Sequence, residues 1–370
     1  MPTPPRPIES LDTPAAVVDL DRLDANLRRT AAYAAAHGLA LRPHVKTHKS
    51  VRVADQQLRL GARGLTCATP REAEVMAAVA DDLLLAYPPV GAGRAARIAA
   101  LPARVKLTVA LDSVRALTDV GLAARAAQRP IHAYVELDVG MHRVGLPSVD
   151  DAVRLATRIG EEEGVEFAGI AFYPGHVRQA TGEQDGTLAT MRETLGEAID
   201  RFVRAGLAPR VVSGGSTPTL WRTHEITGVT ELRPGTYVYN DRTTAAIGAC
   251  ALEDCAVTVA ATVISTAVPG QAVIDAGTKS LGREPMPEGM GDGFGALLSH
   301  PEVVVSRMSE EHGILDLSRT TWRPMVGEVV RVIPNHVCIV VHLNDLMYGA
   351  RDGVVETTWP VDARGRGERP

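Results

Sequence analysis

The feature that most constrains the fold is a regular alternation of short apolar runs and longer amphipathic stretches over residues 1–245. Strands are expected at 15–20, 39–45, 64–68, 82–86, 106–111, 131–137, 166–172, 210–213 and 231–232. Helices are expected between them at 21–38, 50–61, 71–79, 113–128, 150–163 and 184–205. This alternation is typical of βαβ units that build a parallel sheet. Roughly eight repeats in about 230 residues favour a (β/α)8 TIM barrel over a six-stranded open sheet.

The pattern changes after residue 246, where the apolar runs become short and rich in β-branched residues. These runs cover 255–266, 271–275, 302–306, 312–316, 328–333, 337–343 and 354–358. Turn residues separate them and no convincing helix lies between, which is typical of an all-β domain. The chain is therefore α/β, with a barrel domain at 1–245 and a C-terminal β domain at 246–370. The first few residues of the chain could belong to either domain.

Charge and cysteine content exclude several classes of function. The 44 acidic and 39 basic residues give a net charge of −5, and neither sign forms a long block. A nucleic-acid groove or a polybasic membrane anchor needs clustered Lys and Arg, so neither partner is expected. No apolar run approaches the ~18 residues that span a bilayer, and no signal peptide is evident. The four cysteines are widely scattered, which fits a reducing cytoplasm.

A lysine-containing motif, Pro-His-Val-Lys-Thr-His-Lys at 43–49, stands at the carboxyl end of the second expected strand. Barrel enzymes build their active sites at this end. A lysine among other cations in a barrel mouth has a depressed pKa, which Schiff-base chemistry requires. Lys46 is therefore a candidate catalytic residue, and a solvated basic loop is the alternative.

Two further motifs follow expected strands. In 138–145, glycines on both sides of Arg143 indicate a tight turn that lets backbone approach a ligand, or else an exposed βα turn. The segment from Phe172 to His176 ends another strand and carries Tyr173. A histidine there can act as a general acid or base near neutral pH, although a lone histidine is more often structural.

The segment Ser-Gly-Gly-Ser-Thr-Pro at 213–218 indicates an anion site. A strand that runs into two glycines and hydroxyl residues presents backbone N–H groups and side-chain donors to a phosphate. It lacks the spaced glycines of a dinucleotide fingerprint and the lysine of a Walker loop. A flexible Gly-Ser turn is the alternative. The candidate phosphate ligands are Ser213, Gly214, Gly215, Ser216 and Thr217.

His336 and Cys338 form a candidate metal pair in the β domain. On a strand, residues two apart share a face, so the imidazole and the thiolate converge on one ion. Two protein ligands leave positions open for substrate. His342 shares the face but lies about 13 Å away along an extended strand, so it is not expected to be a third ligand. A core cysteine beside a partly exposed histidine is the alternative.

These motifs occur in an order that resembles the D-threonine aldolase and D-serine dehydratase family of alanine-racemase-like, fold-type III pyridoxal-phosphate enzymes. The resemblance covers nearly the whole chain, from about residue 13 to 364. The lysine motif and the late His-x-Cys pair are its specific elements. The motifs that carry it are at 43–49, 140–145, 213–216, 233–239 and 334–338.

The resemblance implies a pyridoxal 5'-phosphate (PLP) barrel followed by a β domain, usually as a homodimer. Lys46 matches the lysine that forms the internal aldimine, and Arg143 matches an arginine near the cofactor ring. His176 matches a histidine that handles the substrate hydroxyl proton. The remaining matches are the phosphate loop at 213–217, Tyr239 as a further phosphate contact, Tyr173 as a cofactor neighbour, and His336 and Cys338 as ligands of a divalent metal (Zn, Mn or Mg).

The implied activity is cleavage of small β-hydroxy-D-amino acids, with D-threonine giving glycine and acetaldehyde. A dehydratase acting on D-serine or D-3-hydroxyaspartate, which yields a 2-oxo acid and ammonia, would use the same residues. In this resemblance, cysteine at position 338 favours the dehydratase and zinc, whereas the segments 311–313, 344–345 and 359–361 favour the aldolase. An amino-acid racemase and a non-catalytic PLP carrier are further alternatives, and neither explains a metal pair.

Overall fold

The computed structural model describes residues 5–365, and the chain divides into two compact units. The barrel unit comprises Arg29–Lys46 and Val51–Gly235. The β unit comprises the chain up to Arg28, the short segment Thr47–Ser50, and Thr236–Arg364. The barrel unit therefore ends ten residues before the boundary that the sequence predicts, and the β unit also takes in the N-terminal segment.

The barrel unit is built on one eight-stranded parallel sheet in the order β3-β10-β9-β8-β7-β6-β5-β4. The two ends of this order also meet, because His44 bridges Thr66 in parallel and the Val45 N–H donates to the Thr66 carbonyl at 2.9 Å. The sheet thus curls back on itself, and the predicted α/β barrel fold is confirmed. Its strands are β3 (Ala40–Leu41), β4 (Leu65–Cys67), β5 (Asp82–Leu85), β6 (Lys106–Leu111), β7 (Ile131–Leu137), β8 (Val165–Phe172), β9 (Val211–Gly214) and β10 (Glu231–Leu232).

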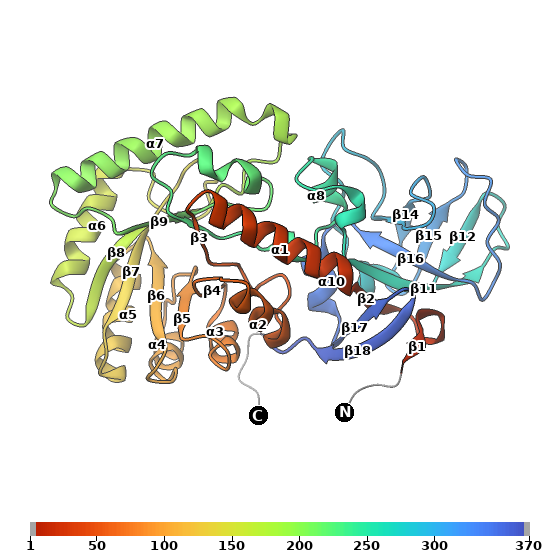
Figure 1. Ribbon diagram of the computed structural model, residues 1–370, viewed down its shortest axis with the longest axis horizontal. Helices are drawn as coiled ribbons and strands as arrows, with labels where there is room; N and C mark the ends of the chain where they lie inside the picture. Colours follow the sequence, from red (N-terminus) through yellow and green to blue (C-terminus); the bar gives the residue numbers. More distant parts are fainter. Residues whose placement is uncertain (1–4, 366–370) are drawn as a thin grey trace. The chain divides into compact units, whose positions relative to one another are not determined.

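Amphipathic helices cover the outside of this sheet, and in Figure 1 α4, α5 and α6 lie along β5–β8. Helix α6 shows why: Ala152, Leu155, Ala156 and Ile159 are buried at helical spacing. Its N-cap Ser148 accepts a hydrogen bond from the Asp151 N–H and so satisfies one free donor of the first turn. The helices are α1 (Leu20–Ala36), α2 (Val51–Arg59), α3 (Pro70–Met76), α4 (Ala92–Ala99), α5 (Val114–Ala127), α6 (Val149–Glu161) and α7 (Asp185–Arg204).

The β unit contains a ten-stranded sheet in the order β1-β18-β17-β2-β11-β12-β15-β14, with β16 paired to β11 and β13 paired to β16. Its strands are β1 (Arg6–Pro7), β2 (Ala15–Asp19), β11 (Val257–Ser265), β12 (Gln271–Ile274), β13 (Gly295–Leu297), β14 (Val305–Met308), β15 (Gly313–Asp316), β16 (Val329–Pro334), β17 (Leu346–Arg351) and β18 (Val354–Pro360). Three short helices accompany the sheet: α8 (Arg242–Ala246), α9 (Thr278–Leu281) and α10 (Val337–Leu343).

Two sequence predictions about these elements are wrong. The strand expected at 15–20 was counted among the barrel strands, but β2 pairs with β11 and β17 in the other sheet. The strand expected at 337–343 is helix α10, so His336 and Cys338 do not alternate along a strand. Val337, Val340 and Val341 are buried at helical spacing, and this packing overrides the strand propensity of β-branched residues.

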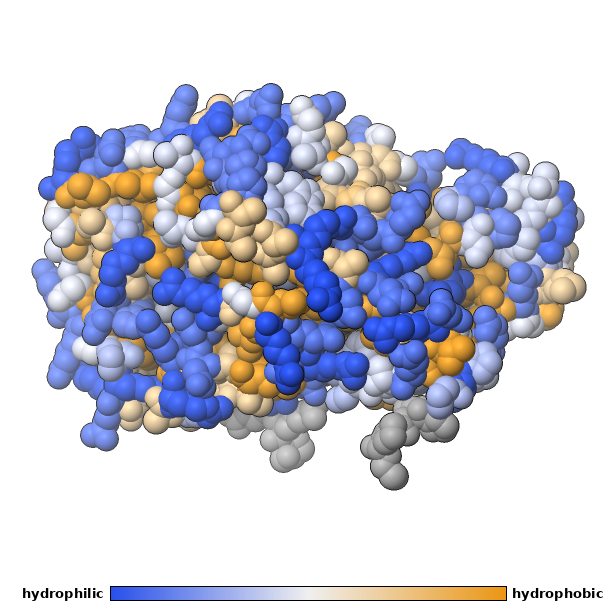
Figure 2. Space-filling view, in the orientation of Figure 1, coloured by the Kyte–Doolittle hydropathy of each residue, from blue (hydrophilic) through white to orange (hydrophobic). Residues whose placement is uncertain are grey.

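Among residues 5–365, no helix is long and apolar enough to cross a membrane. On the face shown in Figure 2, hydrophobic residues are interspersed with hydrophilic ones. Single exposed apolar side chains of this kind are normal on folded proteins.

Candidate active site

Three of the predicted site residues converge in the barrel unit, in loops that follow parallel strands. Lys46 lies beyond β3, Arg143 beyond β7 and Tyr173 directly beyond β8. The Lys46 Nζ is 5.4 Å from the centroid of the Tyr173 ring, and the Arg143 guanidinium carbon is 4.8 Å from it. Two cations therefore share one aromatic ring at the carboxyl ends of the strands, where barrel active sites lie.

His176 lies next to the glycine loop that contains Arg143. Gly140 has φ +114°, and a Cβ at this position would be 3.1 Å from the His176 Nε2. Burial lowers the pKa of His176, against the opposing charge of Asp138. The buried Nδ1 of His176 has no hydrogen-bond partner within residues 5–365. The imidazole is therefore held as the neutral base at neutral pH, with its Nε2 beside the turn.

The expected phosphate loop begins with the last two residues of β9, and its residues 213–217 are buried. Gly215 has φ +90°, and a Cβ at Gly214 would be 2.2 Å from the Phe172 ring, so both positions need glycine. The Ser213 hydroxyl donates to the buried Glu231 carboxylate at 2.7 Å. The Ser216 N–H donates to the Thr219 hydroxyl at 3.2 Å, and Thr217 is 3% exposed. The Ser213 hydroxyl is therefore used in a hydrogen bond inside the barrel. The part of the turn left for a phosphate is the backbone at Gly215.

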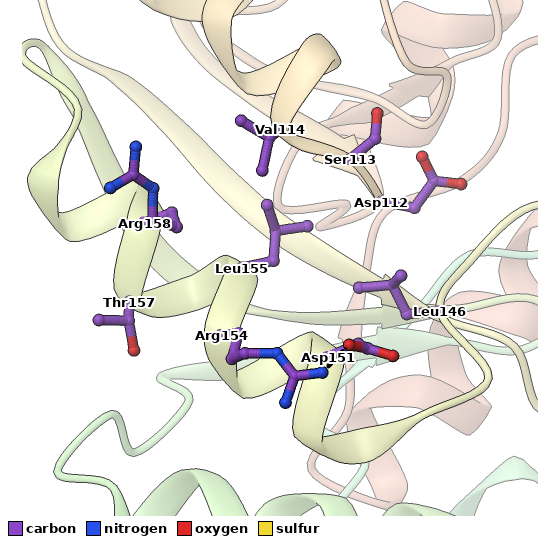
Figure 3. A pocket seen from close by; sticks show the side chains of 9 residues that line it. All are labelled: Asp112, Ser113, Val114, Leu146, Asp151, Arg154, Leu155, Thr157 and Arg158. Carbon is purple, nitrogen blue, oxygen red and sulfur yellow. Dashed lines mark hydrogen bonds and ion pairs between the residues drawn. The ribbon is translucent and has the colours of Figure 1, made fainter.

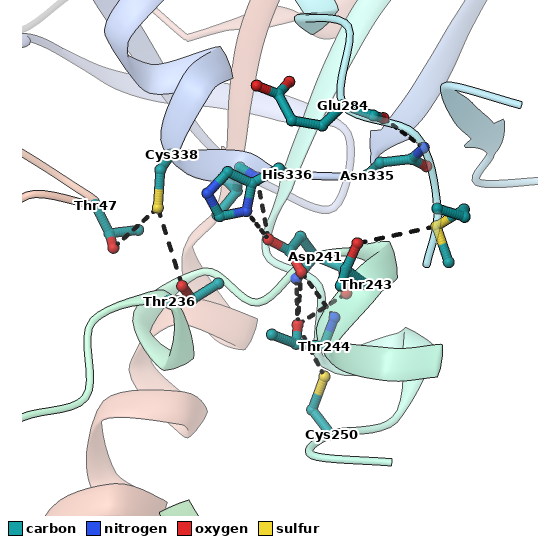
Figure 4. Close-up of polar contacts among 12 residues, drawn as sticks. Thr47, Thr236, Asp241, Thr243, Thr244, Cys250, Glu284, Asn335, His336 and Cys338 are labelled. Carbon is teal, nitrogen blue, oxygen red and sulfur yellow. Dashed lines mark hydrogen bonds and ion pairs between the residues drawn. The ribbon is translucent and has the colours of Figure 1, made fainter. Parts of the chain in front are cut away.

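His336 and Cys338 come together in the β unit at the start of helix α10, where His336 is the N-cap residue (Figure 4). The His336 Nδ1 is 3.2 Å from the Asp241 Oδ2, and the same oxygen accepts the Val337 N–H at 3.1 Å. Asp241 has no exposed surface and also caps α8 through the Thr244 N–H. The Asp241 carboxylate therefore fixes the orientation of the His336 ring.

The electrostatics of this pair match a site for positive charge. The charge of Cys338, and after it the hydrogen bond to Asp241, raises the pKa of His336 to about 11 against the opposing effect of burial. An imidazole and a thiolate are a donor set that suits zinc-like divalent metals. Among residues 5–365, no group of three or more His, Cys, Asp and Glu side chains is placed so that it could hold a metal ion.

Two threonines hold the Cys338 side chain in place (Figure 4). The Cys338 Sγ is hydrogen bonded to the Thr47 hydroxyl at 3.2 Å and lies 3.9 Å from the Thr236 hydroxyl. Thr47 directly follows Lys46 in the chain. Tyr239, three residues after Thr236, has no exposed surface and belongs to the β unit.

Asp241 and Thr47 are functional-site residues that the sequence pattern does not predict. The segment Asp-Arg-Thr-Thr at 241–244 is a recognisable helix start, and its capping box is present. Its contact with His336 joins residues 95 positions apart, which no local pattern predicts.

A pocket elsewhere in the barrel unit has none of the predicted residues in its lining. It has a volume of about 520 Å³ and opens between the start of α5 and the exposed side of α6 (Figure 3). It is lined by Asp112, Ser113, Val114, Leu146, Asp151, Arg154, Leu155, Thr157 and Arg158. Two cations of the lining are already paired, Arg154 with Asp151 and Arg158 with Glu161.

The chain is similar to known enzymes along its whole length. It is 33% identical to the D-threonine aldolase of Arthrobacter sp over 98% of this chain and 95% of the relative. The D-threonine aldolase structure from Filomicrobium marinum has a TM-score of 0.89 and 31% identity, covering 97% of both chains. The D-threo-3-hydroxyaspartate dehydratase from Delftia sp. HT23 has a TM-score of 0.86 and 32% identity, covering 98% of this chain and 100% of the dehydratase.

Family models cover both parts of the chain. Residues 18–243 match the alanine racemase N-terminal domain, and residues 256–350 match a putative serine dehydratase domain. The first match covers more than half of the chain, and the resemblance predicted from the motifs is confirmed. The chain belongs to the alanine racemase N-terminal domain family, in the group of D-threonine aldolases and D-serine dehydratases that join this domain to a serine dehydratase domain.

Proposed function

We propose that this protein is a PLP- and divalent-metal-dependent lyase that cleaves β-hydroxy-D-amino acids, with D-threonine giving glycine and acetaldehyde. The observation that carries the proposal is the hydrogen bond between Thr47 and Cys338. It ties the candidate metal pair to the residue that follows the candidate Schiff-base lysine. The full-length similarity to two D-threonine aldolases supports the same reaction.

The residues of the barrel unit fit PLP. Lys46 supplies the amine, Arg143 and Tyr173 surround it, and the glycine turn at 214–215 leaves backbone space that a side chain would fill. Tyr239, Ser216 and Thr217 complete the proposed cofactor contacts, whereas Ser213 supports the loop through Glu231. When bound, PLP supplies an electron sink for bonds at the substrate Cα.

His336 and Cys338 fit a divalent metal. Asp241 accepts from the His336 Nδ1 and thereby leaves Nε2 as the donor atom, an arrangement common among metal-bound histidines. A metal on two protein ligands keeps open positions, and it supplies Lewis acidity for a substrate hydroxyl. A solved cysteine-to-alanine mutant of D-threo-3-hydroxyaspartate dehydratase is described as being in the metal-free form. Zinc is the metal that we propose for a thiolate ligand.

His176 is the proposed acceptor of the substrate hydroxyl proton. Burial keeps it neutral, and Gly140 leaves its Nε2 approachable. Proton removal from the hydroxyl oxygen drives cleavage of the Cα–Cβ bond in an aldolase. The dehydratase is the second candidate, because Cys338 gives a thiolate-containing pair and one similar structure is a dehydratase. In that reaction Lys46 would take the α-proton.

Product analysis separates the two reactions. The protein, loaded with PLP and zinc, is incubated with D-threonine, and products are identified by mass spectrometry. We expect glycine and acetaldehyde in equal amounts. 2-Oxobutyrate with ammonia would instead establish the dehydratase, and absence of turnover on D-threonine, D-serine and D-3-hydroxyaspartate would reject both. L-Threonine and the Lys46→Ala protein serve as matched blanks.

We also infer a homodimer in the cytoplasm. The family resemblance implies the dimer, and the scattered cysteines fit a reducing compartment. Light scattering coupled to size exclusion tests the oligomeric state: a mass of twice 39.3 kDa is expected, and a mass of 39.3 kDa contradicts it.

A further inference from the structure

A second polar cavity lies at the opposite end of the barrel from Lys46. It has a volume of about 180 Å³ and is lined mainly by residues at the amino-terminal ends of the strands. Asp82 and Lys106 begin β5 and β6, and Arg210 directly precedes β9. We call this space the basal cavity; its lining is Arg42, Arg63, Asp82, Lys106, Thr108, His132, Tyr134, Ala168, Arg210 and Val211.

Positive charge predominates around the basal cavity. Its lining contains four cations and one carboxylate. That carboxylate, Asp82, is engaged by Arg42 at 2.7 Å, and Arg42 is also bonded to the buried Glu231 at 2.8 Å. Two more carboxylates contact lining residues: Glu231 contacts Arg42, and Glu166 lies 3.4 Å from the His132 Nδ1. When both are counted, the cations still exceed the carboxylates by one.

In the part of the chain that the structure describes, the cationic side chains of this lining other than Arg42 form no short ion pair with a carboxylate. Within residues 5–365 the Lys106 ammonium has no ion-pair partner. The Arg63 Nε is 3.9 Å from Asp82, and Arg210 donates to the Phe167 carbonyl at 3.3 Å. These groups therefore keep donors that can turn toward a ligand.

Two residues from the barrel interior bring hydroxyl groups to the lining of the basal cavity. Tyr134 and Thr108 are each 3% exposed and line the basal cavity. Burial, and after it the charge of Glu231, raises the pKa of Tyr134 to about 12, so its hydroxyl remains a donor at neutral pH.

We propose that the basal cavity binds a small oxyanion of the phosphate type, either inorganic phosphate or the phosphate group of a small metabolite. Such an anion needs several donors that converge on one small space, and Lys106, Arg63 and Arg210 supply the charged ones. The hydroxyls of Tyr134 and Thr108 supply neutral donors from the barrel interior. The cavity is separate from the proposed PLP loop at 213–217, which begins at the carboxyl end of β9.

Calorimetric titration of the PLP-saturated protein tests this proposal, because the cofactor then occupies its own phosphate site. Inorganic phosphate and glycerol 3-phosphate are titrated separately in a low-salt chloride buffer. We expect saturable binding at one site per chain with unchanged visible absorbance of the cofactor. Binding of both ligands identifies a phosphate group as the recognised unit, and binding of inorganic phosphate alone identifies the free ion.

Two variants remove ligand contacts and a third is their control. Lys106→Met removes the unpaired charge, and Tyr134→Phe removes one hydroxyl and keeps the buried ring. Each variant should weaken phosphate binding by about tenfold or more, because each loses one hydrogen bond to the charged ligand. Lys279→Met removes an exposed lysine paired with Glu310 and Glu311 in the β unit, and should bind as the wild type does. Absence of saturable binding to the wild-type protein, or equal affinity in all three variants, overturns the proposal.

Discussion

His176 and Asp241 are two side chains whose environments set their proposed chemistry. His176 is partly buried beside Gly140, whereas Asp241 is completely buried beneath His336. The first is a base whose protonation state depends on pH. The second is a positioning residue that acts through another side chain. Each leads to a measurement that a purely structural role would not affect.

The neutral form of His176 should set the acidic limb of the pH profile. Because burial lowers its pKa below the ordinary 6.5, His176 is the free base above that pH and becomes charged only at lower pH. We expect kcat/KM for D-threonine cleavage to be constant just above pH 6.5 and to fall as the pH drops below it. His176→Gln should lose most of the activity together with this limb. An acidic limb that persists unchanged in the variant would assign it to another group.

Removing the charge of Asp241 should weaken metal binding without removing a ligand. Asp241→Asn keeps the size of the side chain but loses the anionic acceptor for the His336 Nδ1 and the Val337 N–H. We expect zinc affinity to fall about 10–100-fold in a chelator competition assay, the usual cost of losing such a partner. Asp292→Asn, at an exposed carboxylate in the same unit, is the control and should bind zinc normally. Equal affinities in the two variants would contradict the positioning role.

At the scale of elements, Arg42 links three strands of the barrel. It lies just beyond β3 and is bonded to Asp82 at the start of β5 and to Glu231 at the start of β10. Arg42→Met should lower the free energy of unfolding by about 3–5 kcal/mol, because two carboxylates lose their buried partner. Urea denaturation followed by circular dichroism measures this loss. Arg59→Met, at an exposed arginine paired with Asp55, should change stability by less than about 1 kcal/mol.

Elements with local signals could be predicted from the sequence, and elements set by distant contacts could not. The bounds expected for β6, β7 and β10 agree with the structure, because buried parallel strands are continuous apolar runs between turn residues. The sequence predicts a strand where helix α10 lies, because its β-branched residues favour strands: Val337, Ile339, Val340 and Val341. Its helical state depends on burial of one face and on the contact between its first N–H and Asp241.

The candidate site shows the same division. Lys46 and Tyr173 could be placed together because both follow parallel strands, whose carboxyl ends share one edge of the barrel. The role of Ser213 could not be predicted in full, because its hydroxyl bonds to Glu231 on the neighbouring strand β10. Sequence spacing identifies which loops gather, but not which polar atoms are already satisfied inside the protein.

At the scale of the whole molecule, the proposed Schiff-base lysine and the proposed metal ligands belong to different units. Lys46 belongs to the barrel unit, whereas His336, Cys338 and Asp241 belong to the β unit. Dialysis against a chelator should therefore abolish D-threonine cleavage while the visible absorbance of the lysine-bound cofactor remains. Adding zinc back should restore activity. Loss of the absorbance together with the metal would show that cofactor retention requires it.

The position of β2 in its sheet has a consequence for how the chain folds during synthesis. The last barrel strand, β10, is complete at Leu232, but β2 lies between β11 and β17, and β17 ends only at Arg351. During synthesis β2 therefore keeps both edges unpaired until β11 has emerged, and it keeps the edge that β17 will cover unpaired until almost the whole chain has emerged. Unpaired edges invite association between chains. A fragment that begins at residue 246 would lack this inner strand. The β unit can therefore form only when the N-terminal segment with β2 is present in the chain.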